Sequence, residues 1–234
     1  MTEPVLLVSD LRKTFAVGPL ATRQFEALRG ISLEVRAGSS FGFLGPNGAG
    51  KSTTIKILAG LLLPTSGRVT LFGSDPSSPT GRNRLGYLPE NPSFHDHLTG
   101  LEVLCFLGSL AGVARKMIKT RASQLLELVG LSRAAGTQVR RYSKGMVQRL
   151  GIAQALLHEP ELLILDEPMS GLDPMGRRDV KQIIRQLRQE GRTVFFSTHI
   201  ISDVEELCDE LVIIDQGQIV RSGRLGDLIA ADDC

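Results

Sequence analysis

The sequence predicts an α/β fold with a mostly parallel core sheet. Three apolar runs of strand length, at residues 41–44, 162–165 and 194–196, each lead into glycine or polar residues. Continuous apolar strands that alternate with helical segments are typical of parallel sheets covered on both faces. Because ligands bind beyond the carboxyl ends of such strands, we expect the residues that follow the three runs to form one site.

The composition favours a folded protein and excludes several classes. The 234 residues are 42% hydrophobic and 22% charged, with a net charge of +2, which argues against a disordered chain and against broad nucleic-acid binding. Cys105, Cys208 and Cys234 lie far apart, so we expect neither a disulfide framework nor a zinc site. The longest apolar stretch, at residues 103–114, is too short to span a membrane.

The remaining elements follow from residue patterns. Alternating or β-branched residues predict strands over residues 5–8, 31–35 and 69–72 in the N-terminal third. Leucines at helical spacing predict a helical insertion over residues 99–139. Residues 95–97, which read His-Asp-His, favour a solvated loop over a metal site because no other histidine is near in sequence.

A glycine-rich segment follows the first apolar run. It reads Gly45, Pro46, Asn47, Gly48, Ala49, Gly50, Lys51, Ser52 and Thr53, which matches the phosphate-loop pattern G-x-x-x-x-G-K followed by S or T. Lys51 would neutralise phosphate charge, and Ser52 would bind Mg²⁺. A helix that opens at Thr53 and is closed by residues 65–67 would point its positive dipole end at the anion. The segment predicts nucleotide binding.

Two acidic residues follow the second apolar run. Asp166 would face the phosphate loop, which suits a residue that holds Mg²⁺. Glu167 could orient a water behind the terminal phosphate or act as its general base. A solvated acidic turn is the alternative for Glu167.

The order of the motifs carries a family resemblance. After the phosphate loop come residues 142–146 (Tyr-Ser-Lys-Gly-Met), 162–168, 170–173 (Ser-Gly-Leu-Asp) and 197–199 (Ser-Thr-His). This set resembles the nucleotide-binding subunit of ATP-binding cassette (ABC) transporters over nearly the whole chain. The resemblance implies one domain with a P-loop NTPase core, an N-terminal antiparallel β portion and an inserted helical subdomain. The implied boundaries are residues 1–90 and 142–220 for the core, about 91–141 for the insertion and 221–234 for a tail.

The resemblance also implies that two chains, most simply a homodimer, enclose two ATP molecules. Ser143 and Gly145 of one chain would contact the terminal phosphate held by the other, from a helix N-terminus that attracts anions. Helix capping alone is the alternative for Ser143. Lys144 and Met146 depart from the usual Leu-Ser-Gly-Gly-Gln signature, and the role of Lys144 stays open.

Further roles come from the same resemblance. The catalytic residues would be Glu167, Asp173 and His199. The ligands of Mg²⁺ would be Ser52, Asp166 and Glu90, the last of which stands where the family usually has glutamine. Phe15 matches the aromatic residue that stacks on adenine. The structural alternatives are an exposed loop acid for Glu90 and core positions for His199 and Phe15.

The function implied is an ATPase subunit, with ATP and Mg²⁺, that powers transport through a separate integral membrane permease. It would be cytoplasmic, bound to the inner face of the membrane through that permease, with no nucleic-acid partner. Residues 90–97 and 98–107 would carry the coupling. Three segments, residues 142–146, 171–174 and 197–208, look like those of stand-alone cassettes of ABC-2 exporters. The alternatives are a soluble ABC ATPase of translation or DNA repair and a cassette that regulates a membrane complex; the cargo cannot be read from this chain.

Overall fold

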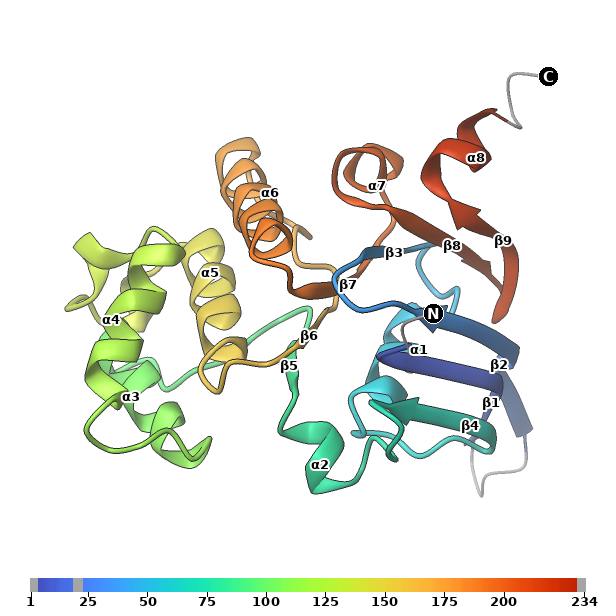
Figure 1. Cartoon of the computed structure of the whole chain (residues 1–234), viewed down its shortest axis with the longest axis horizontal. Coiled ribbons are helices and arrows are strands. Elements are labelled where there is room, and N and C mark those ends of the chain that lie inside the picture. The colour runs from blue at the N-terminus through green and yellow to red at the C-terminus, as the bar shows by residue number, and fades with distance from the viewer. Residues whose placement is uncertain (1–3, 19–22, 231–234) are drawn as a thin grey trace.

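The computed structural model describes residues 4–18 and 23–230, which form two β-sheets and a helical region (Figure 1). Cys105 and Cys208 are both free thiols. Cys234 and residues 19–22 lie outside the described residues. No helix in the described ranges is both long enough and apolar enough to cross a membrane.

The larger sheet has six strands in the described residues, and five of them run parallel. Their order is β5 (Leu85–Leu88), β6 (Leu162–Leu165), β7 (Thr193–Thr198), β3 (Ser40–Leu44), β8 (Glu210–Asp215) and β9 (Gln218–Arg224), with β9 antiparallel to β8. The three apolar runs of the sequence are the adjacent strands β6, β7 and β3. All residues of these strands are buried, which confirms a mostly parallel sheet covered on both faces.

Helices lie on both faces of this sheet. They are α1 (Lys51–Leu58), α6 (Pro174–Gln189) and α7 (Ile201–Leu207). Successive residues of a strand face opposite sides. Phe195 accordingly packs in one buried cluster with Ile55 of α1, and Phe196 packs in another with Val180 of α6. In Figure 1, α1 lies on the opposite side of the sheet from α6 and α7.

Helix α1 differs from the predicted helix at both ends. It begins at Lys51, before the predicted Thr53, and it ends at Leu58 instead of at residues 65–67. Gly60 adopts a left-handed conformation with φ 67, which commonly ends a helix because other residues rarely adopt it. The prediction of a helix closed by residues 65–67 is therefore wrong.

The smaller sheet is antiparallel and confirms the predicted N-terminal β portion. Its order is β2 (Arg23–Val35), β1 (Leu6–Val17) and β4 (Ser66–Leu71). The strands predicted over residues 5–8, 31–35 and 69–72 lie in this sheet. β1 and β2 extend well beyond the predicted lengths because register shifts let their pairing continue past polar residues.

The predicted helical insertion is present. It consists of α3 (Gly100–Leu110), α4 (Ile118–Leu128) and the 3₁₀ turns η2 (Ser132–Ala134) and η3 (Val139–Arg141), and it is followed by α5 (Lys144–Ala155). α5 contacts α3 and α4 as well as β5. Leu104, Leu125 and Leu150 share a buried cluster with Leu163 of the sheet. The domain boundary at residues 91–141 stays a prediction, since α5 joins both parts.

Two short helices complete the fold, α2 (Pro79–Arg82) and α8 (Leu225–Ala230). The segment predicted as a tail, residues 221–234, therefore begins inside β9 and continues into α8. The carboxyl ends of β3, β6 and β7 remain at one edge, where the phosphate loop begins.

The packing of β5 against the end of α5 can be tested at Gly86. A Cβ atom there would lie 2.4 Å from the carbonyl oxygen of Ala155 and 2.9 Å from Cγ of Pro160. We expect Gly86→Ala to destabilise the fold by about 1–3 kcal/mol, the usual cost of overpacking a rigid site. The urea midpoint measures this change. Gly136→Ala is the control, because an added Cβ meets nothing within 4 Å; equal midpoints for the two variants would contradict the close packing.

Candidate functional site

A cavity of about 420 Å³ opens at the predicted edge of the sheet. Six residues of the predicted phosphate loop line it: Asn47, Gly48, Gly50, Lys51, Ser52 and Thr53. Glu90 and Glu167 add carboxylates from the segments after β5 and β6. Gly45 and Ala49 are buried outside the lining, and Pro46 is exposed beside it. With Phe25 and Ala27 of β2, which also line the cavity, the structure brings together four segments that are distant in sequence.

The phosphate loop is anchored to β7 and opens directly into α1. The Gly45 N–H donates to the carbonyl oxygen of Thr198 at 3.1 Å. α1 begins at Lys51 without a side-chain cap from its N-cap residue, Gly50, so within residues 4–18 and 23–230 its first N–H groups lack the usual side-chain partner. Together with the helix dipole, these free donors make the end of α1 attractive to an anion.

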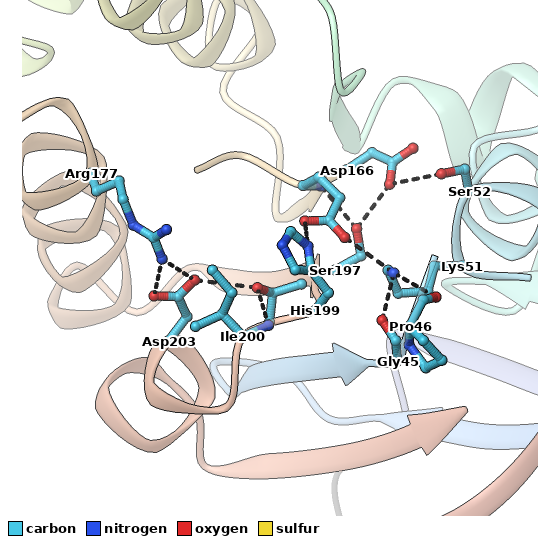
Figure 2. Close-up of polar contacts among 12 residues, drawn as sticks. Gly45, Pro46, Lys51, Ser52, Asp166, Arg177, Ser197, His199, Ile200 and Asp203 are labelled. Carbon is cyan, nitrogen blue, oxygen red and sulfur yellow. Dashed lines mark hydrogen bonds and ion pairs between the residues drawn. The ribbon is translucent and has the colours of Figure 1, made fainter. Parts of the chain in front are cut away.

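Lys51 is held by oxygen atoms on three sides. Its Nζ lies 2.6 Å from the carbonyl oxygen of Gly45, 3.1 Å from that of Pro46 and 3.1 Å from Oε1 of Glu167. The side chain is only 5% exposed. The ammonium group therefore lines the cavity with its charge balanced by Glu167. Figure 2 shows Lys51 beside Gly45 and Pro46.

Glu167 connects Lys51 to His199. Its second carboxylate oxygen, Oε2, lies 3.0 Å from Nδ1 of His199. Glu167 has φ 45, a left-handed conformation that costs free energy for a residue other than glycine. A hydrogen bond from its N–H to Oγ of Ser197, at 2.8 Å, helps to hold that conformation. Such strain is common where a side chain must be aimed precisely.

Asp166 is buried between two hydroxyl groups. Oγ of Ser197 donates to its Oδ1 at 2.8 Å, and Oγ of Ser52 donates to the same oxygen at 3.3 Å. Burial raises the pKa of Asp166 above its ordinary value. The carboxylates of Glu90 and Glu167 raise this pKa further, while the two hydrogen bonds oppose the shift. Binding of a cation here would relieve the unfavourable burial of negative charge.

The oxygen atoms around Asp166 fit a magnesium ion. The carboxylates of Asp166 and Glu90 and the hydroxyl of Ser52 are hard ligands of the kind that Mg²⁺ prefers. Within residues 4–18 and 23–230, no group of three or more histidine, cysteine, aspartate or glutamate side chains could hold a metal. The remaining ligands would have to be phosphate oxygens and water, which is the usual arrangement for Mg²⁺.

Ser197 belongs to the motif at residues 197–199, but the sequence analysis assigned it no role of its own. Its hydroxyl accepts from the N–H of Glu167 and donates to Asp166, so one side chain fixes both acidic residues. The available signal was its place at the carboxyl end of a central parallel strand, between the predicted Glu167 and His199 segments. The hydrogen bonds themselves depend on the neighbouring position of β6 and β7.

The structure places the predicted site residues Ser143, Gly145 and Asp173 at two helix N-termini and not in the lining of the cavity. Ser143 caps α5 by accepting from the N–H of Met146 at 3.2 Å, and Asp173 caps α6 by accepting from the N–H of Gly176 at 3.0 Å. A Cβ on Gly145 would lie 3.7 Å from Cα of Gly176. The N-termini of α5 and α6 therefore lie side by side, and neither lines the cavity around Lys51.

Phe25, and not the predicted Phe15, lines the cavity. The two residues are cross-strand partners in β1 and β2. Phe25 is 54% exposed, whereas the ring of Phe15 lies beneath Nζ of Lys13 at 5.1 Å from its centroid. The sequence signal for Phe25 was weak, because its position beside the phosphate loop depends on the register of two irregular strands.

Comparison with known proteins identifies similar chains. Residues 28–170 match the family model described as ABC transporter. The chain is 45% identical to an uncharacterised ABC transporter ATP-binding protein of Nostoc sp., over 99% of this chain and 70% of that protein. It is also 45% identical to a fluoroquinolones export ATP-binding protein of Mycobacterium tuberculosis, over 83% of this chain and 64% of that protein.

Solved structures agree with these sequence matches. The ATP-binding subunit of an ABC transporter superposes with a TM-score of 0.82 at 32% identity, over 98% of this chain and 93% of that chain. A dimeric ATP-binding cassette in a post-hydrolysis state, bound to ADP and Pi, superposes with a TM-score of 0.83 at 25% identity, over 94% and 98% of the two chains.

Proposed function

The chain belongs to the ABC transporter family as an ATP-binding subunit with the family's ATPase fold, and we propose that it powers export through a separate membrane permease. The observation that carries the site assignment is the series of contacts from Lys51 through Glu167 to His199 at the phosphate loop. Relatives that share 41–45% identity include ATP-binding proteins for linearmycin resistance, bacitracin transport and fluoroquinolone export, which supports export over import.

ATP binding uses the end of α1 and Lys51. N–H groups of the phosphate loop and of the first turn of α1 donate to the phosphate oxygens, and Lys51 exchanges its carbonyl contacts with Gly45 and Pro46 for phosphate oxygens. Ser52, Asp166 and Glu90 would hold Mg²⁺, and the ion would supply positive charge that offsets the negative charge developing on the phosphates. Because Lys51 turns toward the phosphates, Glu167 is left with His199 as its remaining partner.

Glu167 and His199 then serve hydrolysis. The oxygen of a water molecule bonds to the γ-phosphorus while the bond to the β,γ-bridging oxygen breaks, which yields ADP and inorganic phosphate. Glu167 orients this water and receives its proton. His199, bonded to Glu167 through Nδ1, keeps the carboxylate aimed and contacts the terminal phosphate. Asp173, at the start of α6, links hydrolysis to reopening of the dimer.

A second copy of the chain completes the site. Ser143 and Gly145 lie outside the cavity of their own chain, at an exposed helix N-terminus. In the closed dimer this N-terminus faces the terminal phosphate held by the partner chain, and the reverse contact forms on the other side. The dimeric cassette with bound ADP and Pi supports this arrangement.

The helical side of the molecule offers a docking surface for the permease. A hollow of about 940 Å³ lies between α2 and the loop that joins α3 to α4, and its lining includes the exposed Leu110 and Met117. A second hollow of about 400 Å³ lies among residues 93–107, within the segments predicted to carry coupling. Exposed apolar side chains at hollows are typical of protein interfaces. Docking there holds the cassette on the inner face of the membrane.

Substitution of Glu167 tests the hydrolytic role. We expect Glu167→Gln to bind ATP but to lose about 10²–10⁴-fold in hydrolysis rate, the usual contribution of general acid–base catalysis, and to accumulate as a dimer with ATP and Mg²⁺. Phosphate release and size-exclusion chromatography measure the two effects. Glu161→Gln is the control, because Glu161 pairs with Arg84 at the surface. A Glu167→Gln variant that stays monomeric and hydrolyses ATP normally would refute the assignment.

Phe25 and Phe15 are compared by a pair of alanine variants. We propose that Phe25 stacks on the adenine ring, so Phe25→Ala should weaken ATP binding by about tenfold, which corresponds to ~1.4 kcal/mol of ring contact. Phe15→Ala should weaken ATP binding by less than about threefold, which is under half of the change in binding free energy expected for Phe25→Ala. Titration with a fluorescent ATP analogue gives both affinities. The larger loss in Phe15→Ala would restore the original prediction for Phe15.

The permease surface is tested by coexpression with a candidate integral membrane permease. We expect Leu110→Asp to abolish copurification while ATP affinity stays the same, because a charge in the hollow opposes apolar docking. Val220→Asp is the matched control, since Val220 is equally exposed but lies on β9. Equal copurification of both variants would place the permease elsewhere, and ATP-driven flux in vesicles separates export from a purely regulatory role.

A further inference from the structure

Asp203 is a buried carboxylate that the mechanism above does not use. It lies in the first turn of α7, and its side chain is 1% exposed. Nη2 of Arg177 lies 2.9 Å and 3.0 Å from its two oxygens, and Nζ of Lys181 lies 3.0 Å from Oδ1. Both cations come from α6. The carboxylate therefore joins α7 to the helix that begins at Asp173.

Asp203 also reaches the end of β7. Oγ1 of Thr198 donates to Oδ2 of Asp203 at 3.2 Å and accepts from the N–H of Ile200 at 3.1 Å. His199 lies between Thr198 and Ile200, so the bond from the Ile200 N–H to the Thr198 hydroxyl fixes the backbone on both sides of His199. Figure 2 shows His199, Ile200 and Asp203 close together. The carbonyl oxygen of Thr198 receives the N–H of Gly45, which ties the same residue to the phosphate loop.

The other end of the network leads to Asp173. The N–H of Arg177 donates to the carbonyl oxygen of Asp173 at 3.0 Å, in the first turn of α6. Asp173 is the N-cap of that helix. A displacement of the α6 N-terminus would therefore move Arg177 and the carboxylate that it holds.

We propose that Asp203 is a positioning residue: through Thr198 it fixes His199 against Glu167, and through Arg177 it couples that position to the N-terminus of α6. This inference rests on the proposed function, because it concerns the geometry of the same hydrolytic site. The contact that Asp203 maintains is the hydrogen bond of 3.0 Å between Nδ1 of His199 and Oε2 of Glu167. Loss of the network slows hydrolysis without weakening ATP binding.

The choice of variant distinguishes a positioning role of Asp203 from a purely structural one. Asp203→Asn would leave Arg177 and Lys181 without their buried counter-charge and can unfold the interface between α6 and α7. Thr198→Val leaves those ion pairs intact and removes only the hydroxyl. Valine has the same shape and suits a strand, and the backbone bond to Gly45 is kept.

Steady-state ATP hydrolysis by the full chain gives the primary result. We expect Thr198→Val to lower kcat by about tenfold, the loss typical of a hydrogen bond to a charged group, while KM and the Kd for ATP change by less than about twofold. Glu206→Gln is the control, because Glu206 pairs with Lys181 and Arg185 across the same two helices without contacting Thr198. Its kcat should match that of the unmodified protein.

A double-mutant cycle that combines Thr198→Val with His199→Ala is the decisive test. If the hydroxyl acts through His199, Thr198→Val should lower kcat no further once His199 is alanine. Independent, multiplicative effects would overturn the inference, as would a normal kcat for Thr198→Val alone. Normal hydrolysis by His199→Ala would instead refute the role of His199 in the proposed function, and the inference with it.

Discussion

Lys51 and Glu167 form an ion pair that is almost completely buried, and it joins the loop after β3 to the loop after β6. Removal of one partner from such a pair typically costs about 3–5 kcal/mol, since the other charge is left without compensation. The two side chains therefore depend on each other until an anion reaches Lys51. Because the free N–H groups of α1 open into the same cavity, a phosphate can replace Glu167 as the counter-charge and leave its carboxylate available for water.

The last residues of β7 make hydrogen bonds on both faces of the sheet. Ser197 and Thr198 are consecutive residues, so their side chains point in opposite directions. Ser197 faces Asp166 and Glu167, and Thr198 faces Asp203 on α7. His199 follows at the point where the strand ends. The period of two in a strand thus lets one segment align the acidic residues and connect them to the helices behind the sheet.

The sequence predicted those parts of the site that follow from strand order. Lys51, Asp166, Glu167 and His199 could be placed together because each follows an apolar strand of a parallel sheet. Contacts that depend on side-chain packing could not be predicted. Phe25 reaches the cavity through the register of bulged strands, and the role of Ser197 depends on two neighbouring strands.

The fold was predictable to a similar extent. The apolar run at residues 211–214 carries the same signal as the three predicted strands and could have revealed β8. β5 and β9 have no comparable signal, since Gly86 interrupts the apolar run of β5 and β9 is largely polar and exposed. The early end of α1 depends on the left-handed conformation of Gly60, which the apolar spacing of Leu58 and Leu62 conceals.

The N-terminus of α5 carries more positive charge than the N-terminus of a typical helix. A helix usually places acidic residues near its positive end, but α5 has none in its first turn and carries Lys144 there instead. Arg140 and Arg141 are exposed just before it, and Nζ of Lys144 lies against Gly171. Ser143 satisfies one N–H group but brings no negative charge. This end of α5 therefore favours an anion, and the terminal phosphate that we propose a second copy holds against it has the required negative charge.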